Sequence, residues 1–172
     1  MEVKKIYLDM DGVLADFDRG VRELCGMKML SQNGKRDPYY DDLMWSAIRK
    51  VDHFYDRLEL MPGARSMFNE IWNQYGERCE ILTGIPRPEG SLVTAAEDKI
   101  HWMHRMFNPD IRVNAVFRKY KLDFCTGLET VLIDDRKKTI LEWREKGGTW
   151  ILHESANRTL DVLRKKGLIP SS

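Results

Sequence analysis

Two aspartates separated by one residue, Asp9 and Asp11, directly follow a short apolar segment and precede Gly12. Two carboxylates at this spacing cannot both enter an apolar core unless a cation or another partner compensates their charge. Glycine at the next position lets the chain turn tightly beside them. The pair is a candidate nucleophile or metal ligand, although such a tripeptide standing alone is also common in solvated turns.

Other reactive side chains follow further apolar segments: Asp134 and Asp135 follow one, Thr83 and Gly84 a second, and Lys121 a third. Because parallel strands end at the same edge of a sheet, four carboxylates, a hydroxyl and an ammonium would meet in one cleft. A cluster of oxygens favours a hard divalent cation, and Mg²⁺ is the expected one. The candidate metal ligands are Asp9, Asp11, Asp134 and Asp135.

The apolar pattern predicts an α/β fold with a five-stranded parallel sheet. Short segments rich in Ile, Val and Leu alternate with amphipathic stretches, which is typical of a parallel sheet covered on both faces. The expected strands are residues 4–8, 78–82, 112–117, 130–133 and 149–152, and the expected helices are residues 62–75, 94–107, 137–146 and 156–166.

Residues 9–77, between the first two strands, form an interval far longer than one crossover helix needs. It contains helix-like segments at 17–25 and 41–51 and a polar loop at 31–38. We therefore predict a core domain of residues 1–16 and 60–172 and a small helical cap of residues 17–59. A cap inserted after the first strand lies over the carboxyl ends of the strands, where ligands bind in such sheets.

The composition of the 172 residues suits one globular domain with a modest insertion. The chain has 28 Lys and Arg against 27 Asp and Glu, so it lacks the basic excess that stable nucleic-acid binding requires. No apolar leader precedes the first strand and no segment approaches the ~20 apolar residues of a membrane span. Three distant cysteines do not suggest a disulfide framework. We expect a soluble, cytoplasmic protein without a membrane partner; its oligomeric state is not predicted.

The ordered set Asp9-x-Asp11-Gly12, Thr83, Lys121 and Asp134-Asp135 resembles the four motifs of the haloacid dehalogenase superfamily phosphatases. More narrowly, residues 8–17, 58–64, 99–102 and 132–136 resemble segments of the 5′(3′)-deoxyribonucleotidases. The likeness covers most of the chain but is poor in the cap. Gly84 follows Thr83 where these nucleotidases often have serine, so one hydroxyl of the family pattern is missing.

This resemblance implies a three-layer, Rossmann-like core and a Mg²⁺-dependent phosphomonoester hydrolase. Asp9 would be the nucleophile that forms a phospho-aspartate, and Asp11 would act as general acid and then as general base. Mg²⁺ would bind to Asp9, to the backbone carbonyl of Asp11 and to Asp134, with Asp135 acting through water.

The resemblance also implies how the substrate is held. Thr83 and Gly84 would contact the phosphoryl group, and Lys121 would neutralise its charge. Lys119 is an alternative for the lysine; the spacing from Lys121 to Phe124 matches the family better. The implied substrate is a nucleoside or deoxynucleoside monophosphate, with another small phosphomonoester or a polynucleotide end as alternatives.

Phe17 matches a position where the nucleotidases stack an aromatic ring on the base, and it is also consistent with packing under the cap. A second wall could come from one of Tyr39, Tyr40, Trp45, Phe54 and Tyr55.

Two readings from other classes remain. A receiver-like phospho-acceptor module also joins acids, a threonine and a lysine around Mg²⁺, but its lysine comes last, whereas Lys121 precedes Asp134. A binding domain with a vestigial site is the other, and the complete set of motif residues argues against it.

Overall fold

The computed structural model describes residues 1–28, 38–86 and 94–171. Within these residues the chain forms one sheet of five strands in the order β3-β2-β1-β4-β5, and all four neighbouring pairs are parallel. The strands are β1 (Lys5–Leu8), β2 (Cys79–Ile85), β3 (Arg112–Phe117), β4 (Thr130–Asp134) and β5 (Thr149–Leu152). The predicted α/β fold and its parallel five-stranded sheet are confirmed.

Strand β2 extends three residues beyond its predicted end at residue 82, because β3 offers it partners as far as the pair Ile85–Phe117. Thr83 and Gly84 therefore belong to the strand instead of following it. Leu8 on β1 pairs with Ile81 on one side and with Ile133 on the other. This register brings the residues after β1 level with the ends of both neighbouring strands.

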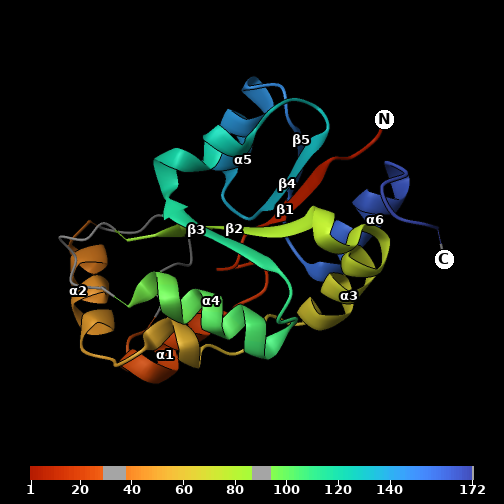
Figure 1. The fold of residues 1–172 in the computed structure, drawn as a ribbon. Helices are drawn as coiled ribbons and strands as arrows, with labels where there is room; N and C mark the ends of the chain where they lie inside the picture. The colour runs from red at the N-terminus through yellow and green to blue at the C-terminus, as the bar shows by residue number, and fades with distance from the viewer. Residues whose placement is uncertain (29–37, 87–93, 172) are drawn as a thin grey trace.

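Helices cover both faces of the sheet (Figure 1). Ile6 and Leu8 face a core shared with α3 (Ala64–Tyr75), α4 (Ala95–Met106) and α6 (Ala156–Lys165). Tyr7 faces the opposite layer, which contains α5 (Lys137–Glu145) and the 3₁₀ helix η4 (Arg118–Phe124). A short 3₁₀ turn, η2 (Gly76–Arg78), leads into β2. Helices α3 to α6 agree within two residues at each end with the predicted ones.

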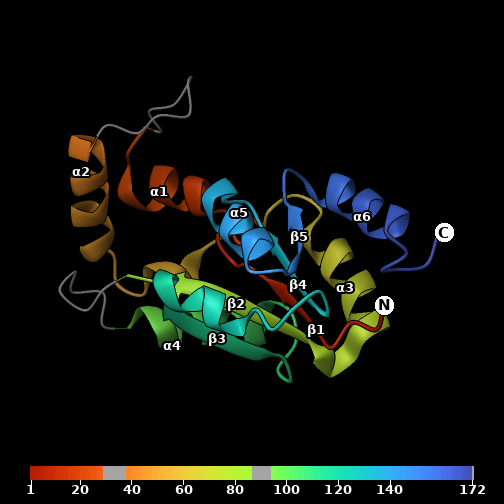
Figure 2. The ribbon, with the colours of Figure 1, turned by 90° about the horizontal axis from the view of Figure 1, so that it is seen from above.

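The insertion between β1 and α3 is helical, as predicted: it contains α1 (Phe17–Cys25), α2 (Pro38–Arg49) and the 3₁₀ helix η1 (Phe54–Arg57). Figures 1 and 2 show α1 and α2 at the end of the molecule opposite both chain termini. Of the predicted polar loop 31–38, only residue 38 lies among the described residues, and it begins α2.

The chain enters and leaves the insertion through two adjacent segments. The Asp16 N–H donates to the Glu59 carbonyl at 2.8 Å, and the Met61 N–H donates to the Leu14 carbonyl at 2.8 Å. These bonds anchor the insertion to the core close to the loop that follows β1. The exact cap limits, residues 17–59, stay a prediction. None of the helices in the described part of the chain has the length and apolarity of a membrane-spanning helix.

Candidate active site

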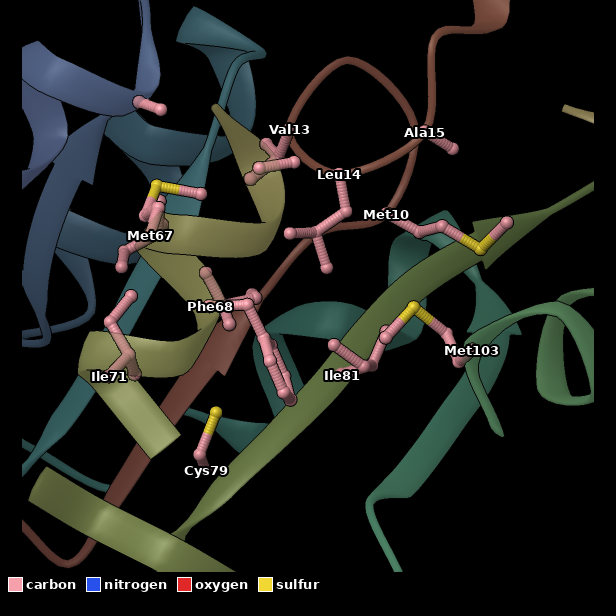
Figure 3. Close-up of a cluster of buried hydrophobic side chains, with 14 of the residues drawn as sticks. Met10, Val13, Leu14, Ala15, Met67, Phe68, Ile71, Cys79, Ile81 and Met103 are labelled. Carbon is pink, nitrogen blue, oxygen red and sulfur yellow. The ribbon is translucent and has the colours of Figure 1, made fainter. Parts of the chain in front are cut away.

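The loop after β1 is anchored by its apolar residues. Met10, Val13 and Leu14 are at most 1% exposed, and Figure 3 shows them gathered with side chains of α3 and β2. The Met10 carbonyl accepts hydrogen bonds from the N–H groups of Leu14 and Ala15, both at 2.9 Å. With Met10 buried between them, Asp9 and Asp11 are held by a rigid turn.

Gly12 is required where this loop meets the end of β4. Its φ is +80°, in the left-handed region that side chains rarely adopt, and an added Cβ would lie 2.0 Å from Asp135 Oδ2. The Asp135 carboxyl therefore tucks directly against the Gly12 backbone, although the residue as a whole is exposed.

Gly12→Ala is expected to displace the Asp135 carboxyl and to destabilise the fold by about 1–3 kcal/mol through strain at positive φ. The affinity for Mg²⁺ should fall as well, measured as the shift of thermal unfolding with Mg²⁺ concentration. Gly167→Ala is the matched control, because Gly167 has a φ of +70° and no neighbour within 4 Å among the described residues. If both variants lose equal Mg²⁺ affinity, the contact with Asp135 is not the cause.

A buried lysine joins two of the predicted metal ligands. Lys121 is 4% exposed, and its Nζ donates to Asp9 Oδ1 at 3.0 Å and to Asp134 Oδ2 at 2.9 Å. The other Asp134 oxygen accepts the Arg136 N–H at 2.8 Å. Lys119 instead is exposed, with its ammonium 5.0 Å from the centre of the Tyr120 ring. Of the two candidate lysines, the structure brings only Lys121 to the carboxylates.

Asp9, Asp134 and Asp135 each present an oxygen within 4.8 Å of the other two. Burial and the charge of Asp134 raise the pKa of Asp9, against the opposing effect of Lys121. Burial of the carboxyl, with the charges of Asp9 and Asp134, raises the pKa of Asp135 to about 8. The cluster is therefore short of positive charge, and its oxygen donors fit a hard divalent cation.

The Asp11 side chain lies apart from this triad and is held by a second buried lysine. Lys99, on α4, has no exposed surface, and its Nζ donates to Asp11 Oδ2 at 2.9 Å, Thr83 Oγ1 at 2.9 Å and the Gly84 carbonyl at 2.7 Å. Burial raises the pKa of Asp11, and Lys99 opposes the rise. The structure thus brings the predicted residues into two adjoining clusters. Asp9, Asp134 and Asp135 lie together with Lys121, whereas the Asp11 carboxyl, Thr83 and Gly84 lie around Lys99.

Sequence reasoning gave Lys99 no role, although its segment was part of the family likeness. A signal was present: Lys99 lies four residues after Ala95 and three and four residues before Trp102 and Met103, all buried on α4. A lysine on the apolar face of a helix needs a buried partner. The pattern therefore predicts a buried lysine but does not identify the carboxylate that it contacts.

A cavity of about 730 Å³ extends from the carboxylates to the insertion. Phe17 and Trp45 line it on the insertion side, and their ring centres are 6.0 Å apart. Phe54 and Tyr55 are 2% exposed and pack behind Phe17, with Tyr55 stacked on it at 6.3 Å. Among the predicted candidates for a second wall, Trp45 is therefore the one at the cavity surface. The volume suits a small-molecule ligand.

No model of a known protein family matches this sequence. Among curated proteins, the mitochondrial 5′(3′)-deoxyribonucleotidase of Mus musculus is 26% identical over 148 residues, which cover 77% of this chain and 64% of that protein. The chain thus spans less than two thirds of the length of this relative.

Solved structures share the fold at low sequence identity. A HAD family hydrolase from Deinococcus radiodurans R1, solved with bound phosphate and sodium, has a TM-score of 0.60 and 11% identity, with 99% of both chains covered. A HAD family enzyme from Bacteroides thetaiotaomicron, solved as a magnesium complex, has a TM-score of 0.51 and 12% identity, covering 95% of this chain and 100% of that one. The chain therefore shares its fold with solved HAD family hydrolases and is a distant homologue of a 5′(3′)-deoxyribonucleotidase.

Proposed function

We propose that this protein is a Mg²⁺-dependent phosphomonoester hydrolase that acts on nucleoside or deoxynucleoside monophosphates through a phospho-aspartate on Asp9. The observation that carries the proposal is that two neighbouring aspartates at one cavity are each bound by a different buried lysine. Asp9 contacts Lys121 at 3.0 Å, and Asp11 contacts Lys99 at 2.9 Å. Two carboxyl groups with different partners can perform different roles in one reaction.

Asp9 is the nucleophile in this proposal. Its carboxylate attacks phosphorus, the bond to the leaving oxygen breaks, and the phosphoryl group is transferred to Asp9. Lys121 holds Asp9 Oδ1 and neutralises charge that develops on the phosphoryl oxygens. The residues that would hold Mg²⁺ are Asp9, Asp134, the Asp11 carbonyl and, through water, Asp135. When bound, the cation keeps these carboxyl groups ionised and neutralises phosphoryl charge.

Asp11 supplies and then removes the proton. Its Oδ2 is bound to Lys99, whereas its Oδ1 is buried and has no hydrogen-bond partner in the described part of the chain. Oδ1 is therefore the oxygen without a competing hydrogen bond, and the proposal assigns to it the proton transfer to the leaving alkoxide. In the second step the same oxygen accepts a proton from the water that hydrolyses the phospho-aspartate. A pKa raised by burial favours the protonated form that the first step requires.

Two observations favour a nucleotide over other phosphomonoesters: the relative named as a deoxyribonucleotidase, and the aromatic surface formed by Phe17 and Trp45. Flat aromatic rings bind a nucleobase by stacking, whichever base it is. The lining of the cavity also includes the basic residues Arg118, Arg136 and Lys137, whose charge suits a phosphate group. Another small phosphomonoester remains the alternative.

A panel of phosphomonoesters with Mg²⁺, including nucleoside and deoxynucleoside 5′- and 3′-monophosphates, tests the proposal when combined with Phe17→Ala. The wild-type protein should prefer nucleotides. Stacking is worth roughly 1–3 kcal/mol per base, so the variant should lose about five- to 150-fold in kcat/KM on a nucleotide. On para-nitrophenyl phosphate, which barely reaches the insertion, the loss should be much smaller.

Comparison of the two substrates distinguishes a loss of base recognition from a general distortion of the active site. Phe17 also packs against Phe54 and Tyr55, and a distorted insertion would depress both substrates together. Equal losses would assign Phe17 to packing alone. Hydrolysis of generic phosphates but of no nucleotide would exclude the nucleotidase proposal and leave the broader phosphatase proposal in place.

A further inference from the structure

Lys99 is a buried ammonium whose three N–H donors are all used. Its acceptors, at 2.7 to 2.9 Å, are Asp11 Oδ2, Thr83 Oγ1 and the Gly84 carbonyl. The Tyr55 ring covers the remaining side, with its centre 4.4 Å from Nζ. Because a lysine ammonium has three donors, each with an acceptor here, the group has no free rotation and needs no solvent.

These contacts connect segments that are far apart in the sequence. Lys99 lies on α4, Asp11 on the loop after β1, Thr83 and Gly84 on β2, and Tyr55 on η1. Burying a charge is costly, and replacing a buried ion pair by apolar side chains is often neutral or stabilising. Packing of α4 alone therefore gives no reason for a lysine at this position. Its charge and geometry serve the groups that it touches.

Each contact settles the orientation of a group in the site. Binding of Asp11 Oδ2 leaves Oδ1 as the carboxyl oxygen with no hydrogen-bond partner in the described part of the chain, and the proposed function assigns the proton transfer to this oxygen. Thr83 Oγ1 accepts from Lys99, so its own hydrogen must point elsewhere and is available to a phosphoryl oxygen. One ammonium group thus fixes the orientation of the carboxyl group that transfers the proton and of a hydroxyl group that can donate to the phosphate.

We propose that Lys99 is a positioning residue that holds Asp11 and Thr83 in register for the two proton-transfer steps. The inference rests on the proposed function. Displacement of a reacting group by about 1 Å can cost on the order of a hundredfold in rate. Lys99→Met, which fills the same space without donors, should therefore lower kcat on a nucleotide about a hundredfold with a smaller change in KM.

The leaving group distinguishes this role from a merely structural one. A nucleoside alkoxide needs the proton of Asp11 to depart, whereas para-nitrophenolate is a stable anion and departs without it. Hydrolysis of the phospho-aspartate needs Asp11 as base with either substrate. With para-nitrophenyl phosphate, Lys99→Met should give a stoichiometric burst and an acid-trappable phosphoenzyme, followed by slow turnover. With a nucleotide it should show no burst.

Two further variants, Lys99→Arg and Lys99→Gln, test the role of the three donors. The matched control is Lys138→Met, because the Lys138 side chain is 72% exposed on α5. Arginine keeps the charge but cannot direct three donors from one nitrogen, so it should not rescue the rate, and glutamine should fail equally. If Lys99→Met does not fold, these two variants carry the test. Full rescue by arginine, or equal losses on both substrates without trapped phosphoenzyme, would overturn the proposal.

A crystal structure of a Lys99 variant provides a readout that does not depend on turnover. The Asp11 carboxyl and the Thr83 hydroxyl should be rotated away from the positions that they hold around the Lys99 ammonium in the wild-type protein. Unchanged positions would refute the positioning role. Absence of hydrolysis by the wild-type protein would instead refute the proposed function, and the two failures are thus distinguished.

Discussion

Asp9→Asn is expected to lower the hydrolysis of every phosphomonoester by about a thousandfold or more, without loss of the fold. An amide nearly preserves the shape of the carboxyl group and can still accept the hydrogen bond from Lys121, but it is not an anionic nucleophile. Burial and Asp134 raise the pKa of Asp9, so its ionised form is a cost to the metal-free fold at neutral pH. Removal of that charge should therefore not lower the melting temperature.

Activity and the trapped phosphoenzyme are the two measurements for Asp9→Asn. Wild-type protein quenched in acid with labelled substrate should carry phosphate, and the variant should carry none. Asp110→Asn, at an exposed residue just before β3, controls for the loss of one carboxylate. If Asp9→Asn retains more than a few per cent of activity with phosphate release confirmed, the phospho-aspartate mechanism is wrong.

The fold and most of the candidate site were predictable because both follow from strand ends. Asp9 and Asp134 each come at the end of an apolar segment, and in a parallel sheet such residues lie along the same edge; these two are close because β1 and β4 are neighbours. The contact between them through Lys121 also depends on β1 and β4 being neighbours and on η4 lying beside them, which the sequence pattern alone does not give. Apolar periodicity therefore predicted the edge at which these residues lie, but not the contacts between them.

Residues whose role depends on tertiary packing were not predictable to the same degree. Lys99 lies in the middle of a helix, and only the packing of α4 against β2 shows that it reaches Asp11. The choice of Trp45 as the second aromatic at the cavity likewise depends on how the insertion folds back. At Gly84, a Cβ would meet Arg118 only at ordinary contact distances from 3.7 Å. The position therefore has room for the serine that the nucleotidases often have there, and nothing in the structure explains the glycine.

Removal of divalent cations is expected to abolish turnover completely and reversibly. Asp9, Asp134 and Asp135 have oxygens within 4.8 Å of one another, and their charges are not balanced by Lys121 alone. A ligand that binds only the folded state raises its stability by mass action, so Mg²⁺ should also raise the melting temperature. The rise in melting temperature caused by Mg²⁺ should be much smaller in Asp134→Asn. Full activity in excess chelator would exclude a metal-dependent mechanism.

Ca²⁺ and pH test whether the cation acts through these carboxyl groups. Ca²⁺ takes about 6–8 oxygens at longer distances, so both oxygens of Asp9 would become ligands and neither would be free to attack. Ca²⁺ should therefore raise the melting temperature while supporting little turnover. The raised pKa of Asp135, about 8, means that protons compete with the cation, and the midpoint of a Mg²⁺ titration should fall as the pH rises toward 8. A midpoint independent of pH would place the cation away from Asp135.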